Sequence, residues 1–207
     1  MAKNKTGSIF ILLLCFLYSA SGQPVLTEYP VLEKTTLLRH QLIAVAESQL
    51  HVREATGNND GPEIRMYLRS VGLPEGNPYC AAGMTWCHDE LNIPNPQSAW
   101  SPDWFRTNVV YRRGSPRLTR FESRPGQVFG LWYESKKRIA HVGMIVGETN
   151  LHYRTIEFNT NGAGSNEGQG NHRLIRKKEN IHVVADYVGY AEYRLGMKNL
   201  RKYDQQN

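Results

Sequence analysis

Cys80 is the residue of this chain whose type and surroundings best suit covalent chemistry. It stands in the segment Asn77-Pro78-Tyr79-Cys80-Ala81-Ala82, where an apolar helical pattern begins. Asn77 is a preferred helix cap and Pro78 fits a first turn, so we expect Cys80 about three residues inside the helix. The unpaired N–H groups of that turn favour a negative charge. The position predicts a thiolate nucleophile, although a cysteine on an apolar helix face is more often a small core residue.

Cys87 lies seven residues after Cys80 on the same predicted helix. Seven helical residues span about 10 Å along the axis, which exceeds the roughly 7 Å between Cα atoms that a disulfide allows. We therefore expect both thiols to be free, although exported proteins usually pair their cysteines. Catalysis is a reason to keep Cys80 free, and burial is the reason that we assign to Cys87.

Three polar residues on two predicted strands supply the partners that a catalytic thiol needs. Period-two alternation places His141 on one face of its strand, and places Glu157 and Asn159 together on one face of the next strand. A hairpin between the strands would bring these side chains to one end of a sheet. A cysteine hydrolase needs a base beside the thiol and a polar group that orients the base. The sequence does not decide whether Glu157 or Asn159 orients the imidazole, and each residue alone is also typical of an ordinary strand position.

Helical patterns fill the first half of the chain beyond its N-terminal leader. Apolar spacing predicts a helix over about residues 32–52 and a second helix that ends near Gly72. Asp60 is the expected cap of the second helix, with Glu63 reaching back as in a capping box. After the helix that carries the thiol, residues 94–117 predict a packed loop with a short helix.

Strand-like patterns fill the second half of the chain. They cover residues 127–133, 141–147, 153–159, 172–176 and the neighbourhood of 182–184. Helices followed by consecutive antiparallel strands predict an α+β domain of two layers, with the N-terminal helices packed on a C-terminal antiparallel sheet.

Residues 1–22 have the layout of a secretory signal peptide, with two lysines, a short apolar run and small residues at the end. The apolar run is too short for a membrane-spanning helix. We therefore expect a leader over residues 1–22, one catalytic domain over residues 23–195 and a basic polar tail over residues 196–207. The mature protein would be secreted or periplasmic, with no stable membrane insertion once the leader is removed.

Composition and charge exclude several classes of function. A chain of 207 residues with 40% hydrophobic content is long enough for one domain with a real core. Its net charge of +6 is mildly basic, and clusters at 173–178 and 198–202 suit either an anionic polymer or a solvated face. No nucleic-acid recognition motif accompanies these clusters, so we expect no nucleic-acid partner. The histidines lack a metal-ligand spacing such as His-x-x-x-His, so we expect no metal and no cofactor.

Several segments resemble the CHAP family, the cysteine, histidine-dependent amidohydrolases/peptidases related to the NlpC-type cell-wall peptidases. Residues 77–82 are similar to the nucleophile segment of that family, residues 141–146 to its histidine strand, and residues 156–160 to its Glu-Gly-Asn-Thr segment. The resemblance extends over roughly residues 40–185. It implies a papain-like α+β fold and the hydrolysis of amide bonds in peptidoglycan, by an endopeptidase or an N-acetylmuramoyl-L-alanine amidase.

The same resemblance implies a role for each candidate residue. Cys80 would attack, His141 would act as base and later as acid, and Glu157 or Asn159 would orient the ring. The backbone N–H of Cys80 would help to hold the oxyanion. The implied partner is peptidoglycan or its peptide stems, bound by a monomer. The alternative is a catalytically inactive cell-wall binding protein of the same fold, and neither the bond cleaved nor the origin of the wall follows from the sequence.

The chain departs from the pattern of that family in four places. Tyr79 stands where the family usually has Trp, Gly83-Met84 replaces a bulky aromatic residue, Gln127 replaces an Asp, and Phe158 replaces a Gly. None of these positions carries a reacting group. They concern the substrate subsites, and Phe158 also bears on how the neighbouring Glu157 is presented.

Overall fold

The computed structural model of the protein describes residues 29–115, 122–164 and 168–191, and of residues 29–35 it describes the backbone alone. The predicted signal peptide and the predicted basic tail lie outside the described residues. Within these ranges, no helix is both long enough and apolar enough to cross a membrane.

The helices come first in the chain. They are α1 (Tyr29–Ser48), α2 (Pro62–Ser70), α3 (Cys80–Asp89) and the short 3-10 helix η1 (Ser101–Phe105). Gly72 ends α2 with a φ of 73°, a left-handed conformation that glycine adopts without strain. The predicted stop near Gly72 is thus confirmed, and η1 lies where a short helix is predicted.

The predicted cap of α2 at Asp60 is wrong. Gly61 is the N-cap residue of α2, and no side chain caps the helix. The Asp60 carboxylate instead accepts hydrogen bonds from the backbone N–H of Thr56, at 2.9 Å, and from its hydroxyl, at 2.6 Å. Asp60 therefore closes the preceding loop, so its carboxylate is not available to the helix.

In the part of the chain that the structure describes, the strands form one antiparallel sheet of six members in the order β1-β6-β2-β3-β4-β5. They are β1 (Val109–Arg112), β2 (Val128–Tyr133), β3 (Arg138–Glu148), β4 (His152–Thr160), β5 (Gly170–Lys177) and β6 (Val183–Ala185), with the 3-10 helices η2 (Glu134–Lys136) and η3 (Lys178–Asn180) between strands. Strands β2 to β5 follow one another as a meander, and β6 returns to pair with β2. Strand β1 was not predicted, because each of its residues is half-buried and shows no alternation.

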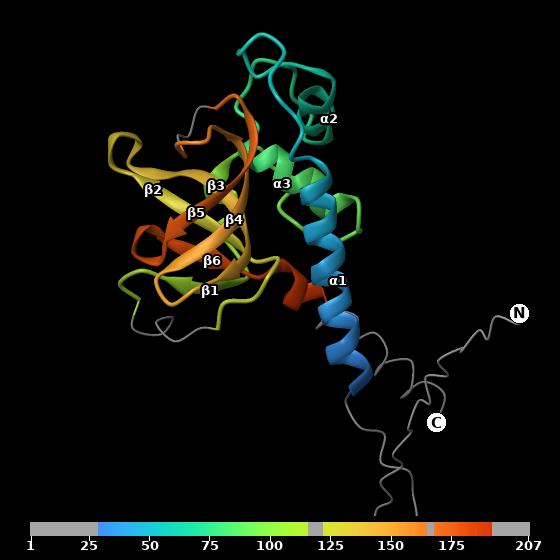
Figure 1. The fold of residues 1–207 in the computed structure, drawn as a ribbon, viewed down its shortest axis with the longest axis vertical. Helices are drawn as coiled ribbons and strands as arrows, with labels where there is room; N and C mark the ends of the chain where they lie inside the picture. The colour runs from blue at the N-terminus through green and yellow to red at the C-terminus, as the bar shows by residue number, and fades with distance from the viewer. Residues whose placement is uncertain (1–28, 116–121, 165–167, 192–207) are drawn as a thin grey trace, which may run out of the picture.

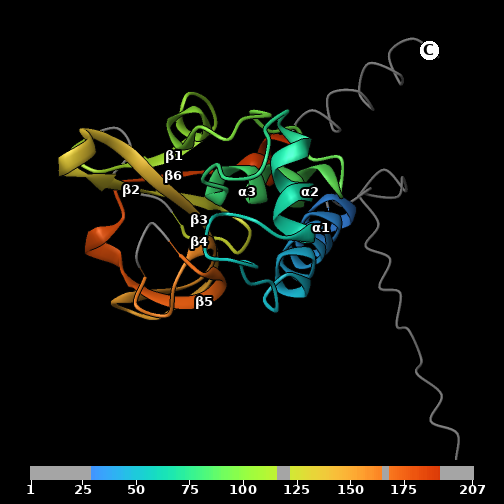
Figure 2. The same cartoon turned by 90° about the horizontal axis from the view of Figure 1, so that it is seen from above.

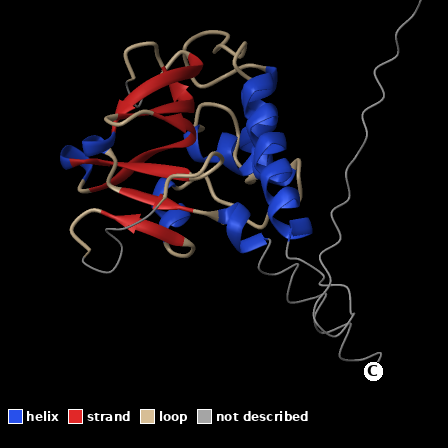
Figure 3. Ribbon diagram, turned by 60° about the horizontal axis from the view of Figure 1, so that its bottom comes forward, coloured by secondary structure: helices blue, strands red, loops and turns tan. Residues whose placement is uncertain are grey.

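Helices α1, α2 and α3 cover one face of the sheet, which makes the domain α+β with two layers, as expected (Figure 1). In the view from above, α1, α2 and α3 lie together beside the strands, and the colouring by secondary structure shows the same separation (Figures 2 and 3). Helix α3 is the one that packs directly on β3 and β4. The residue that begins α3 is therefore brought to the centre of the sheet.

Two apolar clusters lie on the two faces of the sheet. The larger cluster joins α3 to residues of β3 and β4 that include Val142, Met144 and Phe158. The smaller cluster contains Phe129 and Ile145 and lies on the opposite face. Because side chains alternate along a strand, the neighbours of Phe158 and Val142 in the chain point away from the helices.

Candidate active site

Cys80 is the first residue of α3, not the third or fourth as predicted. Tyr79 is the N-cap residue and has no side-chain cap hydrogen bond. The side chain of Asn77 donates instead to the carbonyl oxygen of Pro74 at 3.1 Å, so Asn77 belongs to the preceding turn and the helix begins later. Cys80 still lies in the first turn, where backbone N–H groups lack intrahelical partners and favour a negative charge.

A separation between β3 and β4 gives Cys80 access to the residues on both strands. The predicted hairpin is confirmed, but its paired residues toward the site end at Met144 and Ile156. Beyond this pair, β3 continues beside β2 and β4 continues beside β5. Cys80 interacts with His141, which lies in the part of β3 that is no longer paired with β4.

His141 is fully buried and is held by Glu157 across this separation. Its Nε2 atom donates to the Glu157 Oε2 atom at 2.7 Å. Its Nδ1 atom is buried and forms no hydrogen bond with a described residue. Since Glu157 occupies Nε2, Nδ1 is the ring nitrogen that remains for proton exchange with Cys80. Hydrogen bonds of this kind are often incomplete before a substrate binds.

Glu157 is itself fixed by two further residues. Arg176 of β5 donates to both carboxylate oxygens, from Nε at 2.8 Å and from Nη2 at 2.6 Å. The hydroxyl of Thr155 donates to Oε1 at 2.6 Å. The carboxylate is fully buried, so its charge depends on these partners. Arg176 also donates to the carbonyl oxygen of Gly164 at 3.0 Å, which fixes the guanidinium in turn.

The pKa values of these groups move in the directions that a catalytic thiol requires. Burial alone would raise the pKa of Cys80, but the interactions with His141, Ser101 and the backbone N–H of Val142 outweigh it and lower that pKa. Burial would lower the pKa of His141, yet Cys80 and Glu157 raise it to about 9. Burial opposes ionisation of Glu157 as well, and Arg176 and His141 nevertheless lower its pKa to about 2. The arrangement favours a thiolate, an imidazolium and a carboxylate in a row.

Ser101 lies beside the thiol and was not among the predicted residues. Its Oγ atom is 3.6 Å from the Cys80 Sγ atom, and the side chain is buried at the start of η1. A hydroxyl at this position can donate a hydrogen bond to the thiolate, or to an oxyanion that forms next to the sulfur. The segment 94–117 carries no pattern that would have singled Ser101 out.

Among the described residues, the hydrogen bond to the His141 ring comes from Glu157 and not from Asn159, so the geometry selects Glu157 as the residue that orients the ring. Asn159 has a φ of 52° and lies in a bulge of the β4–β5 ladder between Glu157 and Thr160. Its side-chain oxygen accepts from the backbone N–H of Gly168 at 3.4 Å. Asn159 therefore shapes the end of β4, because the bulge breaks the alternation that would have kept it beside Glu157.

Arg176 is the second residue that sequence reasoning did not place in the site, since it was grouped with a basic surface cluster. Along β5, His172, Leu174 and Arg176 are half-buried, whereas Arg173 and Ile175 are exposed. Alternation with Leu174 was thus the available signal that Arg176 faces inward. Its partner could not be inferred, because the pairing register of β4 with β5 is a tertiary property.

Phe158 and Gly83 fill one space between β4 and α3. A Cβ atom on Gly83 would lie 2.3 Å from the Phe158 ring, and the ring also packs edge-on against Tyr67 at 5.2 Å. On the other face, a Cβ atom on Gly143 would lie 2.7 Å from Cγ of Glu157. Both glycines therefore allow β4 to approach closely, and Phe158 anchors the strand that presents Glu157.

The other two departures from the family pattern lie in supporting contacts. The hydroxyl of Tyr79 donates to Glu54 at 3.3 Å. The Gln127 side-chain amide donates to Asp186 at 3.1 Å, and Asp186 forms a buried ion pair with Arg39 of α1. Through these contacts, Tyr79 fastens the start of α3 and Gln127 supports the ion pair that holds α1.

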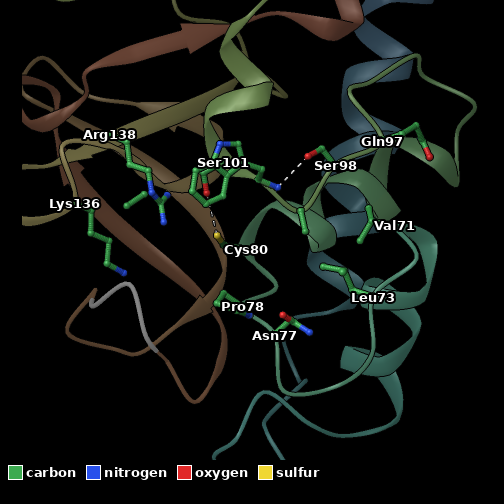
Figure 4. Close-up of a pocket in the computed structure, with 13 residues that line it drawn as sticks. Val71, Leu73, Asn77, Pro78, Cys80, Gln97, Ser98, Ser101, Lys136 and Arg138 are labelled. Carbon is green, nitrogen blue, oxygen red and sulfur yellow. Dashed lines mark hydrogen bonds between the residues drawn. The ribbon is translucent and has the colours of Figure 1, made fainter.

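Cys80 opens on a cleft of about 460 Å³ between the helices and the sheet. Figure 4 shows Val71, Leu73 and Gln97 on the helix side, Arg138 and Lys136 on the sheet side, and Cys80 between them. Although only 4% of Cys80 is exposed, this cleft is a route by which an acyl group could reach the sulfur. Both Cys80 and Cys87 are free, as predicted.

The described residues include no cluster of three His, Cys, Asp or Glu side chains that could hold a metal ion. Comparisons of the chain with protein-family models, curated proteins and solved structures found no match.

Proposed function

We propose that this protein is an exported cysteine hydrolase of papain-like fold that cleaves amide bonds in peptidoglycan, with Cys80 as nucleophile and His141 as base and acid. The observation that carries the proposal is the buried row of Cys80, His141, Glu157 and Arg176 beside an open cleft. Buried charge is costly unless it is paired, so a row of this kind is a strong candidate for a functional site.

Acylation follows from the positions of these atoms. The Sγ thiolate attacks the carbonyl carbon of the amide, a C–S bond forms, and the carbonyl π electrons move to the oxygen. The Cys80 backbone N–H and the Ser101 hydroxyl, 3.6 Å from Sγ, are the donors available to that oxyanion. The C–N bond then breaks, and Nδ1 of His141 gives its proton to the departing amine.

Deacylation uses the same residues in reverse. His141 takes a proton from water, the resulting hydroxide attacks the thioester carbon, and the C–S bond breaks to release the acid and the thiolate. Glu157 stays ionised throughout, because its pKa is lowered to about 2. Its function is to hold Nε2 and to stabilise the imidazolium, as the third member of a triad does.

The substrate class rests on the resemblance to the CHAP family and on the secretory layout of residues 1–22. A leader that directs export would bring the mature domain to the compartment where peptidoglycan is found. The papain-like fold is inferred from the resemblance to that family, whereas the reaction is argued from the side chains of the site.

Digestion of purified peptidoglycan tests the proposal. The mature protein is expected to create new amino and carboxyl termini that mass spectrometry identifies, and Cys80→Ala is expected to lower the rate at least about 10³-fold. Cys87→Ala is the matched control, because it removes a buried thiol from the same helix and should leave the rate close to that of the parent.

Equal rates for Cys80→Ala and the parent would overturn the mechanism. If the parent binds peptidoglycan but creates no new termini, the cell-wall binding alternative replaces the enzyme.

A further inference from the structure

We propose that Arg138 forms a subsite for a substrate carboxylate beside the amide that Cys80 attacks. This inference rests on the proposed function, because it names the chemistry of the substrate for that same thiol. The subsite lies on the sheet side of the cleft, where β3 begins.

The lining of the cleft is electrically one-sided. Arg138 is cationic, and no acidic side chain stands among the described residues that line the cleft. A cleft with charges of one sign concentrates ligands of the opposite sign, so an anionic substrate is favoured.

Arg138 is held in place by an aromatic ring and a backbone carbonyl, which are both uncharged. Its guanidinium carbon lies 3.9 Å from the centre of the Trp100 ring, and Nη1 donates to the backbone carbonyl of Ile139 at 3.0 Å. In the described parts of the chain, no carboxylate forms an ion pair with Arg138. Stacking on an aromatic face fixes the plane of the guanidinium while leaving N–H donors at its edge.

Arg176 provides a contrast within the same protein. Its guanidinium donates through Nε and Nη2 to the two carboxylate oxygens of Glu157, so its charge is already neutralised. The Arg138 guanidinium is stacked on Trp100 and keeps N–H donors at its edge. The spacing of these donors fits the two oxygens of a carboxylate. A carboxylate of the substrate would therefore pair with Arg138 as the Glu157 carboxylate pairs with Arg176.

The opposite wall of the cleft determines the orientation. Val71 and Leu73 come from the helix side and offer apolar contacts, whereas Arg138 points into the cleft from the sheet side, with Cys80 between the two walls (Figure 4). A substrate bound across the thiol would place an apolar group against Val71 and Leu73 and an anionic group against Arg138. The scissile amide therefore lies next to a residue with a free carboxylate.

Binding to the Cys80→Ala protein tests this subsite without requiring catalysis. The probes are soluble stem peptides released from peptidoglycan, either with free carboxylates or after amidation of those carboxylates with carbodiimide and ammonia. Isothermal titration calorimetry is expected to give about tenfold tighter binding of the free acids, the usual size of a charge-assisted hydrogen bond. Arg138→Gln in the same background should remove that preference.

Lys137→Gln is the matched control, because it also removes one positive charge, at an exposed residue next to Arg138 that is ion-paired with Glu134 and does not line the cleft. It should keep the preference for free acids. The inference is overturned if the Cys80→Ala protein binds both kinds of peptide equally, or if it keeps its preference for free acids when Arg138→Gln is added. It is also overturned if Lys137→Gln reduces that preference as much as Arg138→Gln does. Selective binding without cleavage by the native protein would instead sink the hydrolase proposal and leave the subsite standing.

Discussion

Each end of α3 carries a buried cysteine next to a buried histidine. At the N-terminal end, Cys80 meets His141 of β3, and at the C-terminal end, Cys87 is followed by His88. The pKa values of the two pairs move in opposite directions. Burial raises the pKa of Cys87 and lowers that of His88 to about 4, whereas the pKa of Cys80 is lowered and that of His141 is raised to about 9.

The contrast shows what burial alone does and what a row of partners adds. Burial favours the neutral forms of a thiol and an imidazole, and His88 shows this outcome. One of its ring nitrogens is bonded to the Met84 carbonyl oxygen, and the other forms no hydrogen bond with any residue that the structure describes. At the N-terminal end of α3, Cys80 and His141 keep their charged forms, because the charges of Glu157 and Arg176 lie behind the imidazole. In this protein, the pair with the charged forms is the one whose imidazole has the ion pair of Glu157 and Arg176 behind it.

Alkylation of the folded protein gives the largest expected difference between the two ends. Iodoacetamide at neutral pH should modify Cys80 at least about 10³-fold faster than Cys87, because the thiolate is the reactive form and Cys80 opens on the cleft. Peptide mass spectrometry after timed quenching measures both rates. Comparable rates at the two cysteines would break the comparison.

Removal of Arg176 should lower the stability of the fold, because Arg176 forms a buried ion pair with Glu157. Arg176→Met leaves the Glu157 carboxylate buried without its main partner, and the free energy of unfolding should fall by about 3–5 kcal/mol. Arg173→Met is the matched control on β5, because its ion pair with Glu47 is exposed and should contribute less than about 1 kcal/mol. Urea denaturation measures both changes.

A pH profile distinguishes positioning by Arg176 from a purely structural role. Arg176 lowers the pKa of Glu157, so its loss should raise that pKa and move the acid limb of Cys80 alkylation to higher pH. An acid limb that stays at the parent position in Arg176→Met would show that Arg176 does not act through Glu157.

The two histidines should respond to pH with opposite signs. The pKa of His88 lies below its ordinary value, so His88 stabilises the fold above about pH 6.5, and this contribution is lost as the pH falls through about 4. The pKa of His141 lies above its ordinary value, so its contribution is present below about pH 6.5 and is lost as the pH rises through about 9.

His88→Gln isolates the acid part of this prediction. Glutamine does not titrate, so the variant should escape a loss on the order of 3 kcal/mol that the parent undergoes between about pH 7 and about pH 4. Urea denaturation at the two pH values gives the difference. An equal loss in parent and variant would contradict the assignment of a neutral, buried His88.

The smallest effect is expected in the middle of α3, between its two ends. Gly83→Ala should lower the free energy of unfolding by about 1–3 kcal/mol, because the new Cβ atom meets the Phe158 ring. Phe158→Leu in the same chain should recover part of this loss, and the double-mutant cycle measures the coupling. Purely additive losses would show that the two positions do not share one space.

Cys80, His141 and Glu157 could be predicted from the sequence, because patterns within single helices and strands locate them. Helical spacing indicated Cys80, and alternation with a hairpin brought His141 to Glu157. The caps predicted at Asn77 and Asp60 were wrong, because each side chain found a nearer partner in its own loop. The role of Asn159 depended on a bulge, and those of Arg176 and Ser101 on contacts between distant segments, for which the local pattern contains no information.

The contact between Gly83 and Phe158 has a consequence for substitutions in this part of the core. The Phe158 ring occupies the space that a side chain on Gly83 would need, so the volume between α3 and β4 is filled from the strand and not from the helix. A larger residue at position 83 therefore requires a smaller one at position 158, and the two positions are expected to change together rather than one at a time.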